Sequence, residues 1–277
     1  MGRAENIEIF EHTRELYQTE PELTAAIRSS RQMQEVILET SEIPQVLPRY
    51  EEPAEIIVSR KRSFEAAQAY SNDQTCVLNF ASATSPGGGV VRGAAAQEEC
   101  LCRCSTLYAN ISMRKVWMTF YKVHWEQNNR LYNDDCIYTP NVVVFKTDTQ
   151  EPKLMLQEDW WNVNVISCAA PNLRPDRNGK MHVHISGKEL YDLHVKRMRR
   201  ILSIAAMKEN DVVILGAYGC GAFRNPPEIV VYAMQQVVEE FRFHFRTIEF
   251  AVYCSPRDEH NYQVFQRILG GQNVESY

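Results

Sequence analysis

The sequence lacks any apolar run long enough to cross a membrane, and its first residues lack the apolar core of a secretory signal. A membrane-spanning helix needs about 18 consecutive apolar residues, and a signal peptide needs an apolar segment behind a basic start. The N-myristoylation pattern also fails, because Asn6 stands where Ser or Thr is required. We therefore expect a cytoplasmic protein, or a nuclear one in a eukaryote, that is neither secreted nor bound to a membrane.

A surplus of positive charge is missing as well, since the formal net charge is −5. Nucleic-acid-binding proteins usually present a basic field, so we expect no direct sequence-specific contact with nucleic acid, although a local basic strip is compatible with this total. Neither an internal repeat nor a low-complexity segment is present. With 44% hydrophobic and 23% charged residues in 277, the chain is long enough to bury a full core.

The common phosphate-binding fingerprints are also absent. A dinucleotide-binding G-x-G-x-x-G fails twice, because Arg224 and Arg92 stand where its third glycine is needed. A P-loop ending in "GK" at Gly187 fails because His182 replaces its first glycine. These failures exclude an ordinary nucleotide-dependent dehydrogenase and a P-loop NTPase.

The pattern of apolar residues predicts helices that alternate with strands. Helix-like periodicity runs over residues 5–39, with Pro21 in the first turn of a second helix. Strands are predicted at 45–50, 55–59, 75–81, 136–146, 163–172, 211–215 and 247–254. Further helices are predicted at 63–71, from Ala95 onward, and at 189–209, 228–243 and 261–269. Ser63 is expected to cap the helix at 63–71. This order is typical of an α/β protein with a mostly parallel or mixed sheet that helices cover on both faces.

Two glycine-rich loops directly follow predicted strands: "SPGGGV" at 85–90 and "GAYGCGAF" at 216–223. Ligands of such sheets bind beyond the carboxyl ends of the strands, so we expect the two loops to meet at one cleft. Their free amides suit neighbouring phosphates, and a pyrophosphate is the natural candidate. On the loops alone, tight turns without a ligand explain the glycines equally well.

Two adjacent carboxylates, Glu98 and Glu99, follow Gln97 close to the start of a predicted helix. Acidic residues at this place often do no more than interact with the helix dipole. Successive helical residues, however, point about 100° apart, so the two side chains cannot do the same work. One is suited to hold a sugar hydroxyl, while the other faces a bond to be broken.

The spacing of these motifs resembles that of a known family. The triplet "GGG", seven intervening residues and then "QEE" is the signature of poly(ADP-ribose) glycohydrolases. The segments "VLNFASATSPGGGVVRGAAAQEECLCR", "VISCAAPN" and "VILGAYGCGAFRNPP" resemble the compact microbial-type enzymes in the same order, from about Glu5 to about Gly270. The resemblance implies one macrodomain-like domain over 1–277, with a mixed sheet, helices on both faces and an N-terminal helical extension at 1–40.

The resemblance also implies an activity, which is the hydrolysis of ribose–ribose bonds in poly(ADP-ribose) with release of ADP-ribose, mainly from chain ends. Glu99 would be the general acid/base, Glu98 would orient the ribose hydroxyls, and Gln97 would support that geometry. The other implied ligand contacts are Asn79, the first diphosphate loop (Gly87, Gly88, Gly89, Val90), the second loop (Gly219, Cys220, Gly221, Ala222) and Phe223 against the ribose-diphosphate. Poly(ADP-ribose), ADP-ribose and ADP-ribosylated carrier proteins are the expected partners, and the scheme needs no metal or cofactor.

Two other functions are compatible with the glycine loops. A macrodomain-like reader would bind ADP-ribose without cleaving it, and a related hydrolase would act on a single ADP-ribose attached to a protein or nucleic acid. Glu99 separates the first of these from an enzyme, because a reader has no use for a carboxylic acid at the anomeric carbon.

Several other clusters have simpler explanations than a functional site. Among the eight cysteines, those beside strand-like runs are typical of small buried hydrophobes in a reducing compartment, and "CLCRC" at 100–104 lacks the spacing and fourth ligand of a zinc site. "HVH" at 182–184 is interpreted as a surface strand, and "KRMRR" at 196–200 as the solvated face of a helix. Core packing is the preferred role of "WW" at 160–161, whereas the aromatic-rich segment 113–134 is a candidate for shaping substrate access.

Overall fold

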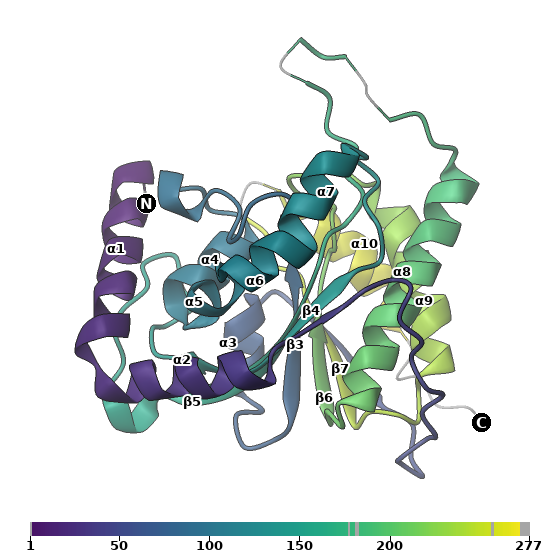
Figure 1. Ribbon diagram of the computed structural model, residues 1–277. Coiled ribbons are helices and arrows are strands. Elements are labelled where there is room, and N and C mark those ends of the chain that lie inside the picture. The colour runs from purple at the N-terminus through teal and green to yellow at the C-terminus, as the bar shows by residue number, and fades with distance from the viewer. Residues whose placement is uncertain (1, 177, 181–182, 256–257, 272–277) are drawn as a thin grey trace.

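The fold is built on one mixed sheet of seven strands (Figure 1). The computed structural model describes residues 2–176, 178–180, 183–255 and 258–271. The strands are β1 (Glu35–Ile37), β2 (Glu55–Ser59), β3 (Thr75–Phe80), β4 (Cys136–Val144), β5 (Trp161–Cys168), β6 (Val212–Leu215) and β7 (Thr247–Ala251). They lie in the order β1-β4-β5-β3-β6-β7-β2, in which the five from β5 to β2 are parallel and β4 and β1 are antiparallel additions.

Helices cover both faces of this sheet, which confirms the expected α/β class. On one face lie α8 (Gly187–Met207), α9 (Pro227–Glu240) and α10 (His260–Leu269), and Figure 1 shows α1 to α7 on the other. Those are α1 (Arg3–Thr19), α2 (Pro21–Met33), α3 (Ser63–Gln68), α4 (Gln97–Cys104), α5 (Leu107–Ile111), α6 (Arg114–Val116) and α7 (Lys122–Gln127). The π-helical segment η2 (Trp117–Tyr121) joins α6 to α7 without a break, and η1 (Val90–Arg92) and η3 (Gln157–Asp159) are short 3-10 turns.

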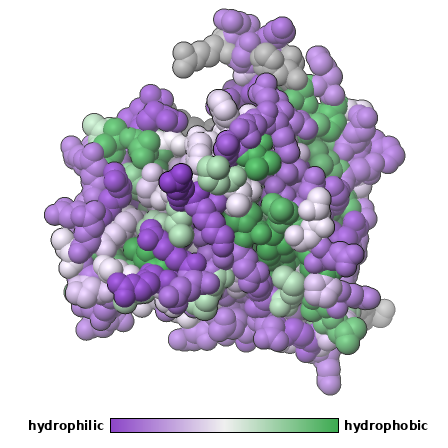
Figure 2. Space-filling model, in the orientation of Figure 1, coloured by the Kyte–Doolittle hydropathy of each residue, from purple (hydrophilic) through white to green (hydrophobic). Residues whose placement is uncertain are grey.

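Both faces of the central strands are apolar because both are covered. In β3, Cys76 and Leu78 join the core beneath α8, α9 and α10, while Val77 joins the core beneath α3, α4 and α5. This alternation is the two-residue period of a strand, and continuous apolar runs are typical of parallel strands covered on both faces. The surface in Figure 2 is correspondingly covered mainly by hydrophilic residues, with smaller apolar areas between them. No helix in the described part of the chain is long and apolar enough to cross a membrane.

The N-terminal segment forms the two expected helices, with Pro21 at the start of α2. The expected helical extension to residue 40 is wrong in one respect, because residues 35–37 form edge strand β1, paired with β4. The buried ammonium group of Lys146, just after β4, donates to the carbonyl of Ile9 at 2.9 Å and to the hydroxyl of Thr13 at 2.7 Å. These bonds join α1 to the end of the sheet.

Some predicted elements differ from the structure for local reasons. Residues 45–50 form no strand, because the amides of Arg49 and Tyr50 both donate to the carbonyl of Phe243 in a loop rather than to a neighbouring strand. Ser63 is the first residue of α3 rather than its cap, which is Arg62. Helix α4 begins at Gln97, two residues after the predicted start.

The interpretation of residues 196–200 as a solvated face is wrong for Arg197. Its side chain is only 1% exposed, and its Nε donates to Oδ1 of Asp134 at 2.8 Å. Its Nη1 donates to the carbonyl of Ala169, also at 2.8 Å. A buried guanidinium requires such partners, and here they join α8 to the loop that precedes β4 and to the end of β5.

Gly93 marks a close contact between the chain after the first glycine loop and α1. It has φ of 72°, and a Cβ there would lie 2.2 Å from the carbonyl oxygen of Arg3. We expect Gly93→Ala to lower the free energy of unfolding by about 2–4 kcal/mol, since it combines an unfavourable φ with a clash against backbone. Urea denaturation checks this. Gly179→Ala is the matched control, because Gly179 has φ of 78° and no neighbouring atom of the described residues lies within 4 Å of the added Cβ. Equal losses for both variants would contradict the role of the contact.

Candidate active site

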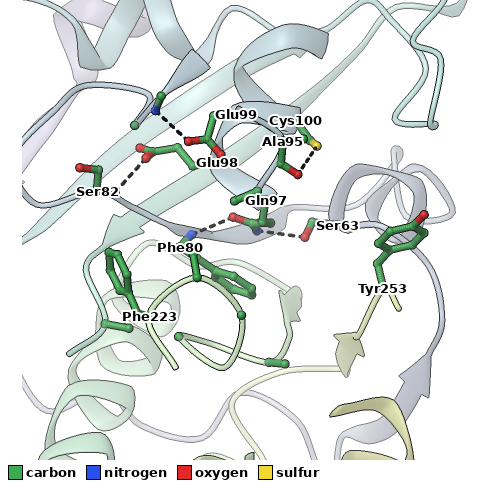
Figure 3. A pocket seen from close by; sticks show the side chains of 18 of the residues that line it. Ser63, Phe80, Ser82, Ala95, Gln97, Glu98, Glu99, Cys100, Phe223 and Tyr253 are labelled. Atoms are coloured by element: carbon green, nitrogen blue, oxygen red, sulfur yellow. Dashed lines mark hydrogen bonds between the residues drawn. The ribbon is translucent and has the colours of Figure 1, made fainter. Parts of the chain in front are cut away.

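Both glycine loops line one cavity of about 590 Å³. The first loop follows β3 and the second follows β6, and these strands are parallel neighbours in the sheet. The cavity therefore lies beyond the carboxyl ends of the strands, where α/β sheets bind ligands. Figure 3 shows the pair Glu98–Glu99 on one side of it and Phe223 on another.

Most of the residues singled out in the sequence line this cavity. They are Gly88, Gly89, Gln97, Glu98, Glu99, Gly219, Gly221, Ala222 and Phe223. Four others are not part of the described lining: Asn79, Gly87, Val90 and Cys220. The side chain of Val90 is fully buried in the core beside α4 and α5, and Asn79 lies buried under the cavity, where its Nδ2 donates to Oγ of Ser167 at 2.9 Å.

The side chain of Gln97 is fully occupied by hydrogen bonds inside the protein. Its Oε1 accepts from the amide of Phe80 at 2.8 Å, and its Nε2 donates to the carbonyl of Leu78 at 2.8 Å and to Oγ of Ser63 at 3.0 Å (Figure 3). Gln97 therefore attaches the start of α4 to the end of β3 and to the start of α3. Its contribution to the site is to position the two residues that follow it.

Glu98 is a buried carboxyl group held from two directions. Its Oε2 accepts from the amide of Ser82 at 2.8 Å, and its Oε1 accepts from Nδ2 of Asn79 at 3.3 Å. Only 3% of the residue is exposed. Burial, reinforced by the neighbouring charge of Glu99, raises the pKa of Glu98 from 4.5 to about 8, although the amide of Ser82 acts in the opposite direction. Glu98 is therefore mainly protonated at neutral pH.

The carboxyl group of Glu99 lies beside that of Glu98, and both face the first glycine loop at Gly88 (Figure 3). Its Oε1 accepts from the amide of Gly89 at 2.8 Å, whereas its Oε2 is buried and has no hydrogen-bond partner among the described residues. Gly88 makes this approach possible: its φ is 58°, and a Cβ there would lie 2.5 Å from Oε1 of Glu99. The glycine loop and the carboxylate are thus packed directly against each other, and only one carboxylate oxygen is hydrogen-bonded within the described residues.

The cavity also contains a charged cluster that the sequence motifs did not indicate. The guanidinium of Arg62 lies 4.1 Å from the centroid of the Tyr253 ring and 4.0 Å from Oδ1 of Asp148. Oδ2 of Asp148 accepts from the amide of Phe64 at 3.0 Å, and burial raises the pKa of Asp148 to about 6. These residues come from segments far apart in the chain, so no local pattern could have joined them.

A second group of residues that the motifs did not indicate lies near Phe223. It consists of Thr84, Tyr132, Asn172 and Arg174, all of which line the cavity. Tyr132 belongs to the aromatic-rich segment 113–134, and its ring centroid lies 6.3 Å from that of Phe223. The segment was a candidate for shaping substrate access, and Tyr132 is its contribution to the cavity wall.

In the described ranges of the chain, no group of three or more His, Cys, Asp or Glu side chains is placed to hold a metal ion. All eight cysteines are free, and burial raises the pKa values of Cys102 and Cys104 well above their usual value. His182 lies outside the described residues, and Val183 and His184 belong to no strand, so a surface strand is wrong for those two. Trp161 is 9% exposed and packs edge-on against Phe64, in agreement with a core role.

Glycine loops and a carboxylate pair thus meet at the carboxyl ends of a mixed sheet, as the resemblance to macrodomain-like glycohydrolases implies. Residues 4–147 match the family of microbial-type PARG catalytic domains, which is more than half of the chain. The chain therefore belongs to the microbial-type poly(ADP-ribose) glycohydrolases and is an enzyme of that class. No match was found among curated protein sequences.

Solved structures of this enzyme class are similar over nearly the whole chain. The poly(ADP-ribose) glycohydrolase of Thermomonospora curvata is 25% identical with a TM-score of 0.80, covering 95% of this chain and 98% of its own. A structure of the same enzyme bound to the inhibitor ADP-HPD is 26% identical with a TM-score of 0.79 and the same coverage. The enzyme of Deinococcus radiodurans in complex with ADP-ribose is 28% identical with a TM-score of 0.73, covering 89% of this chain and 97% of its own.

The raised pKa of Glu98 predicts a pH-dependent contribution to stability. The folded state binds this proton more tightly than the unfolded state, so the stabilisation is complete below about pH 4.5 and is lost as pH rises through about 8. Between about pH 6 and pH 9 the native protein loses about 2–3 kcal/mol from this group, because each pKa unit is worth about 1.4 kcal/mol. We expect Glu98→Gln to lack this loss, so that the variant gains stability relative to the native protein as pH rises. Denaturant unfolding at both pH values tests this, and parallel pH profiles of the two proteins would contradict it.

Proposed function

We propose that this enzyme binds one ADP-ribose unit of poly(ADP-ribose) in the 590 Å³ cavity and hydrolyses its ribose–ribose O-glycosidic bond. The complexes of its relatives with ADP-ribose and with ADP-HPD support this ligand. The second glycine loop is suited to bind the diphosphate, since among the described residues the amides of Gly219, Gly221 and Ala222 donate no hydrogen bond and can approach its oxygens. The first loop, whose Gly89 amide donates to Glu99, is proposed to contact the diphosphate with glycine backbone that no side chain covers. Phe223 packs against the ribose that follows the diphosphate.

Glu99 is the proposed general acid and base. Its buried, unpartnered Oε2 beside the glycine loop is the observation that carries this assignment. Its proton passes to the leaving 2′-oxygen as the bond from that oxygen to the anomeric carbon breaks. Water then bonds to the anomeric carbon and returns a proton to the Glu99 carboxylate. The nearby diphosphate charge stabilises the oxocarbenium character that develops at this carbon.

Glu98 is the proposed positioning residue for the ribose hydroxyls. A protonated carboxyl group both donates and accepts hydrogen bonds, and its pKa of about 8 keeps it in that form at neutral pH. Because Ser82 and Asn79 hold it from the protein side, its orientation is fixed before the substrate arrives. The separate environments of the two carboxyl groups support separate roles.

We further propose that residues 1–277 act as one domain inside the cell, in the cytoplasm or, in a eukaryote, in the nucleus. The eight free cysteines support a reducing compartment. A reader that binds ADP-ribose without cleaving it is less well supported, since it would gain nothing from the unpartnered oxygen of Glu99. A target carrying a single ADP-ribose requires the same proton transfer and differs only in its leaving group.

Glu99→Gln tests the proposed chemistry. Gln keeps the shape of the side chain and can still accept from the amide of Gly89, but it cannot supply a proton. We expect release of ADP-ribose from purified poly(ADP-ribose) to fall about 10²–10⁴-fold, while the affinity for ADP-ribose, measured by calorimetry, stays within about threefold.

The control for this experiment is Glu8→Gln, which removes one exposed carboxylate from α1. Its activity should equal that of the native protein. A Glu99→Gln variant with full activity would refute the assignment. Tight binding of ADP-ribose by a native protein that leaves polymer intact would favour a reader or a hydrolase of singly modified targets.

Exo-action is proposed on the family resemblance, and chains capped at the terminal adenosine ribose test it. An exo-acting enzyme must place an unsubstituted terminal unit in its cavity, so we expect capped chains to be cleaved at least about 100 times more slowly than uncapped chains, a loss of about 2.7 kcal/mol. Product lengths are measured by gel electrophoresis. Efficient internal cleavage of capped chains would overturn exo-action without affecting the role of Glu99.

A further inference from the structure

The active-site cavity continues into a groove beyond Phe223. A cavity of about 660 Å³ shares Thr84 and Tyr132 with the active site, and another of about 1160 Å³ shares Arg174 with it. The two outer cavities share residues 128–130 with each other. Together they extend the active site over the loop after α7 and past the second glycine loop.

Three arginines line the 1160 Å³ cavity, Arg130, Arg174 and Arg224, and Arg174 also lines the active-site cavity. Within the described residues, no hydrogen bond or ion pair engages the guanidinium group of any of the three. The groove's carboxylates have other contacts: Asp176 accepts from the amides of Asn178 and Lys180, both at 2.8 Å, and Glu126 lies 3.5 Å from the ammonium group of Lys122. Among the described residues, the three guanidinium groups are therefore not paired with a carboxylate of the protein.

Backbone hydrogen bonds hold the three arginine-bearing loops together. The carbonyl of Arg130 accepts from the amide of Asn172 at 2.8 Å, and the carbonyl of Phe223 accepts from the amide of Leu173 at 2.9 Å. Arg174 directly follows Leu173, and Arg224 directly follows Phe223. These bonds hold the backbones of the three arginine-bearing loops next to one another and next to Phe223, the residue proposed to contact the reacting ribose.

The substrate places a second diphosphate on this side of the scissile bond. When an ADP-ribose unit occupies the active site, the leaving oxygen belongs to the adenosine ribose of the next unit. That adenosine carries its own diphosphate, and arginine is the side chain best suited to phosphate oxygens. Aromatic rings stack with bases, and Tyr132 lies between the active site and the arginines.

On the basis of the function proposed above, we propose that this groove is a binding site for the penultimate unit of poly(ADP-ribose). Tyr132 contacts the adenosine of that unit, and Arg130, Arg174 and Arg224 bind its diphosphate. The groove makes the enzyme selective for polymer over a single ADP-ribose attached to a small group. It also makes the affinity for polymer dependent on salt, because phosphate contacts at an exposed surface weaken as ions screen them.

Two substrates and one double variant test this proposal. The long substrate is poly(ADP-ribose), and the short one is ADP-ribose joined through its distal ribose to the 2′-oxygen of unphosphorylated adenosine, which has no second diphosphate. The variant Arg130→Gln/Arg224→Gln alters only arginines outside the active-site lining. We expect KM for the polymer to rise about tenfold, with kcat and the KM for the short substrate changing less than twofold. The rise in KM with salt should also be smaller in the variant.

The matched control is Arg28→Gln/Arg267→Gln, which removes the same charge from exposed positions on α2 and α10. It should behave like the native protein on both substrates. An unchanged KM for the polymer in the groove variant would overturn the proposal, as would equal losses on the two substrates.

If the native protein cleaves neither substrate, the proposed function fails. Binding of a two-unit chain to Glu99→Gln protein, with and without the groove arginines, then decides the groove: about tenfold weaker binding without them supports it, and equal binding overturns it.

Discussion

The geometry of the active site depends on the side-chain amide of Gln97, which forms hydrogen bonds with the backbone of β3 where β6 no longer pairs with that strand. Strand β3 pairs with β6 only as far as Val77. Beyond that point Gln97 supplies both a donor, to the carbonyl of Leu78, and an acceptor, for the amide of Phe80. Buried backbone groups need such partners, so the side chain stabilises the separation of β3 from β6 beyond Val77. The same two bonds fix the first turn of α4 between the ends of these strands. The two residues that follow then enter the cavity in directions set by the helix.

Burying two adjacent carboxyl groups is energetically unfavourable, and the protein accommodates the two groups in different ways. Glu98 keeps its proton at neutral pH because burial raises its pKa, so it adds no negative charge beside Glu99. Glu99 receives the amide of Gly89 at one oxygen and nothing from the described residues at the other. An unsatisfied buried oxygen costs about 1–3 kcal/mol, and a substrate hydroxyl or water removes that cost when it binds. The unsatisfied oxygen, which lowers the stability of the free enzyme, therefore lies at the position where the proposed chemistry takes place.

The sequence predicts the parts of this molecule that are local in the chain. The glycine loop, the carboxylate pair and β3 lie within residues 75–99, so a motif contains them all. By contrast, Arg62, Asp148 and Tyr253 meet only in the folded chain. The prediction for Arg197 was wrong for the same reason. Helical periodicity indicates which face of a helix is apolar, but the partner of Arg197 is Asp134, which lies in a loop 63 residues earlier in the chain. Edge strand β1 is only three residues long, which is too short for a period to be recognised.

Overall charge is a poor guide to what such a protein binds. The net charge of −5 opposes any polyanion at long range, but charges interact strongly only within a Debye length of about 8 Å at physiological salt. Amides of the second glycine loop and the three arginines of the proposed groove would act on phosphates within that distance. Because α/β proteins place loops from several strands at one end of the sheet, these groups converge from segments that are far apart in the chain. In the proposed groove, a negatively charged protein would therefore present local positive groups to successive phosphates of an anionic polymer, on either side of the scissile bond.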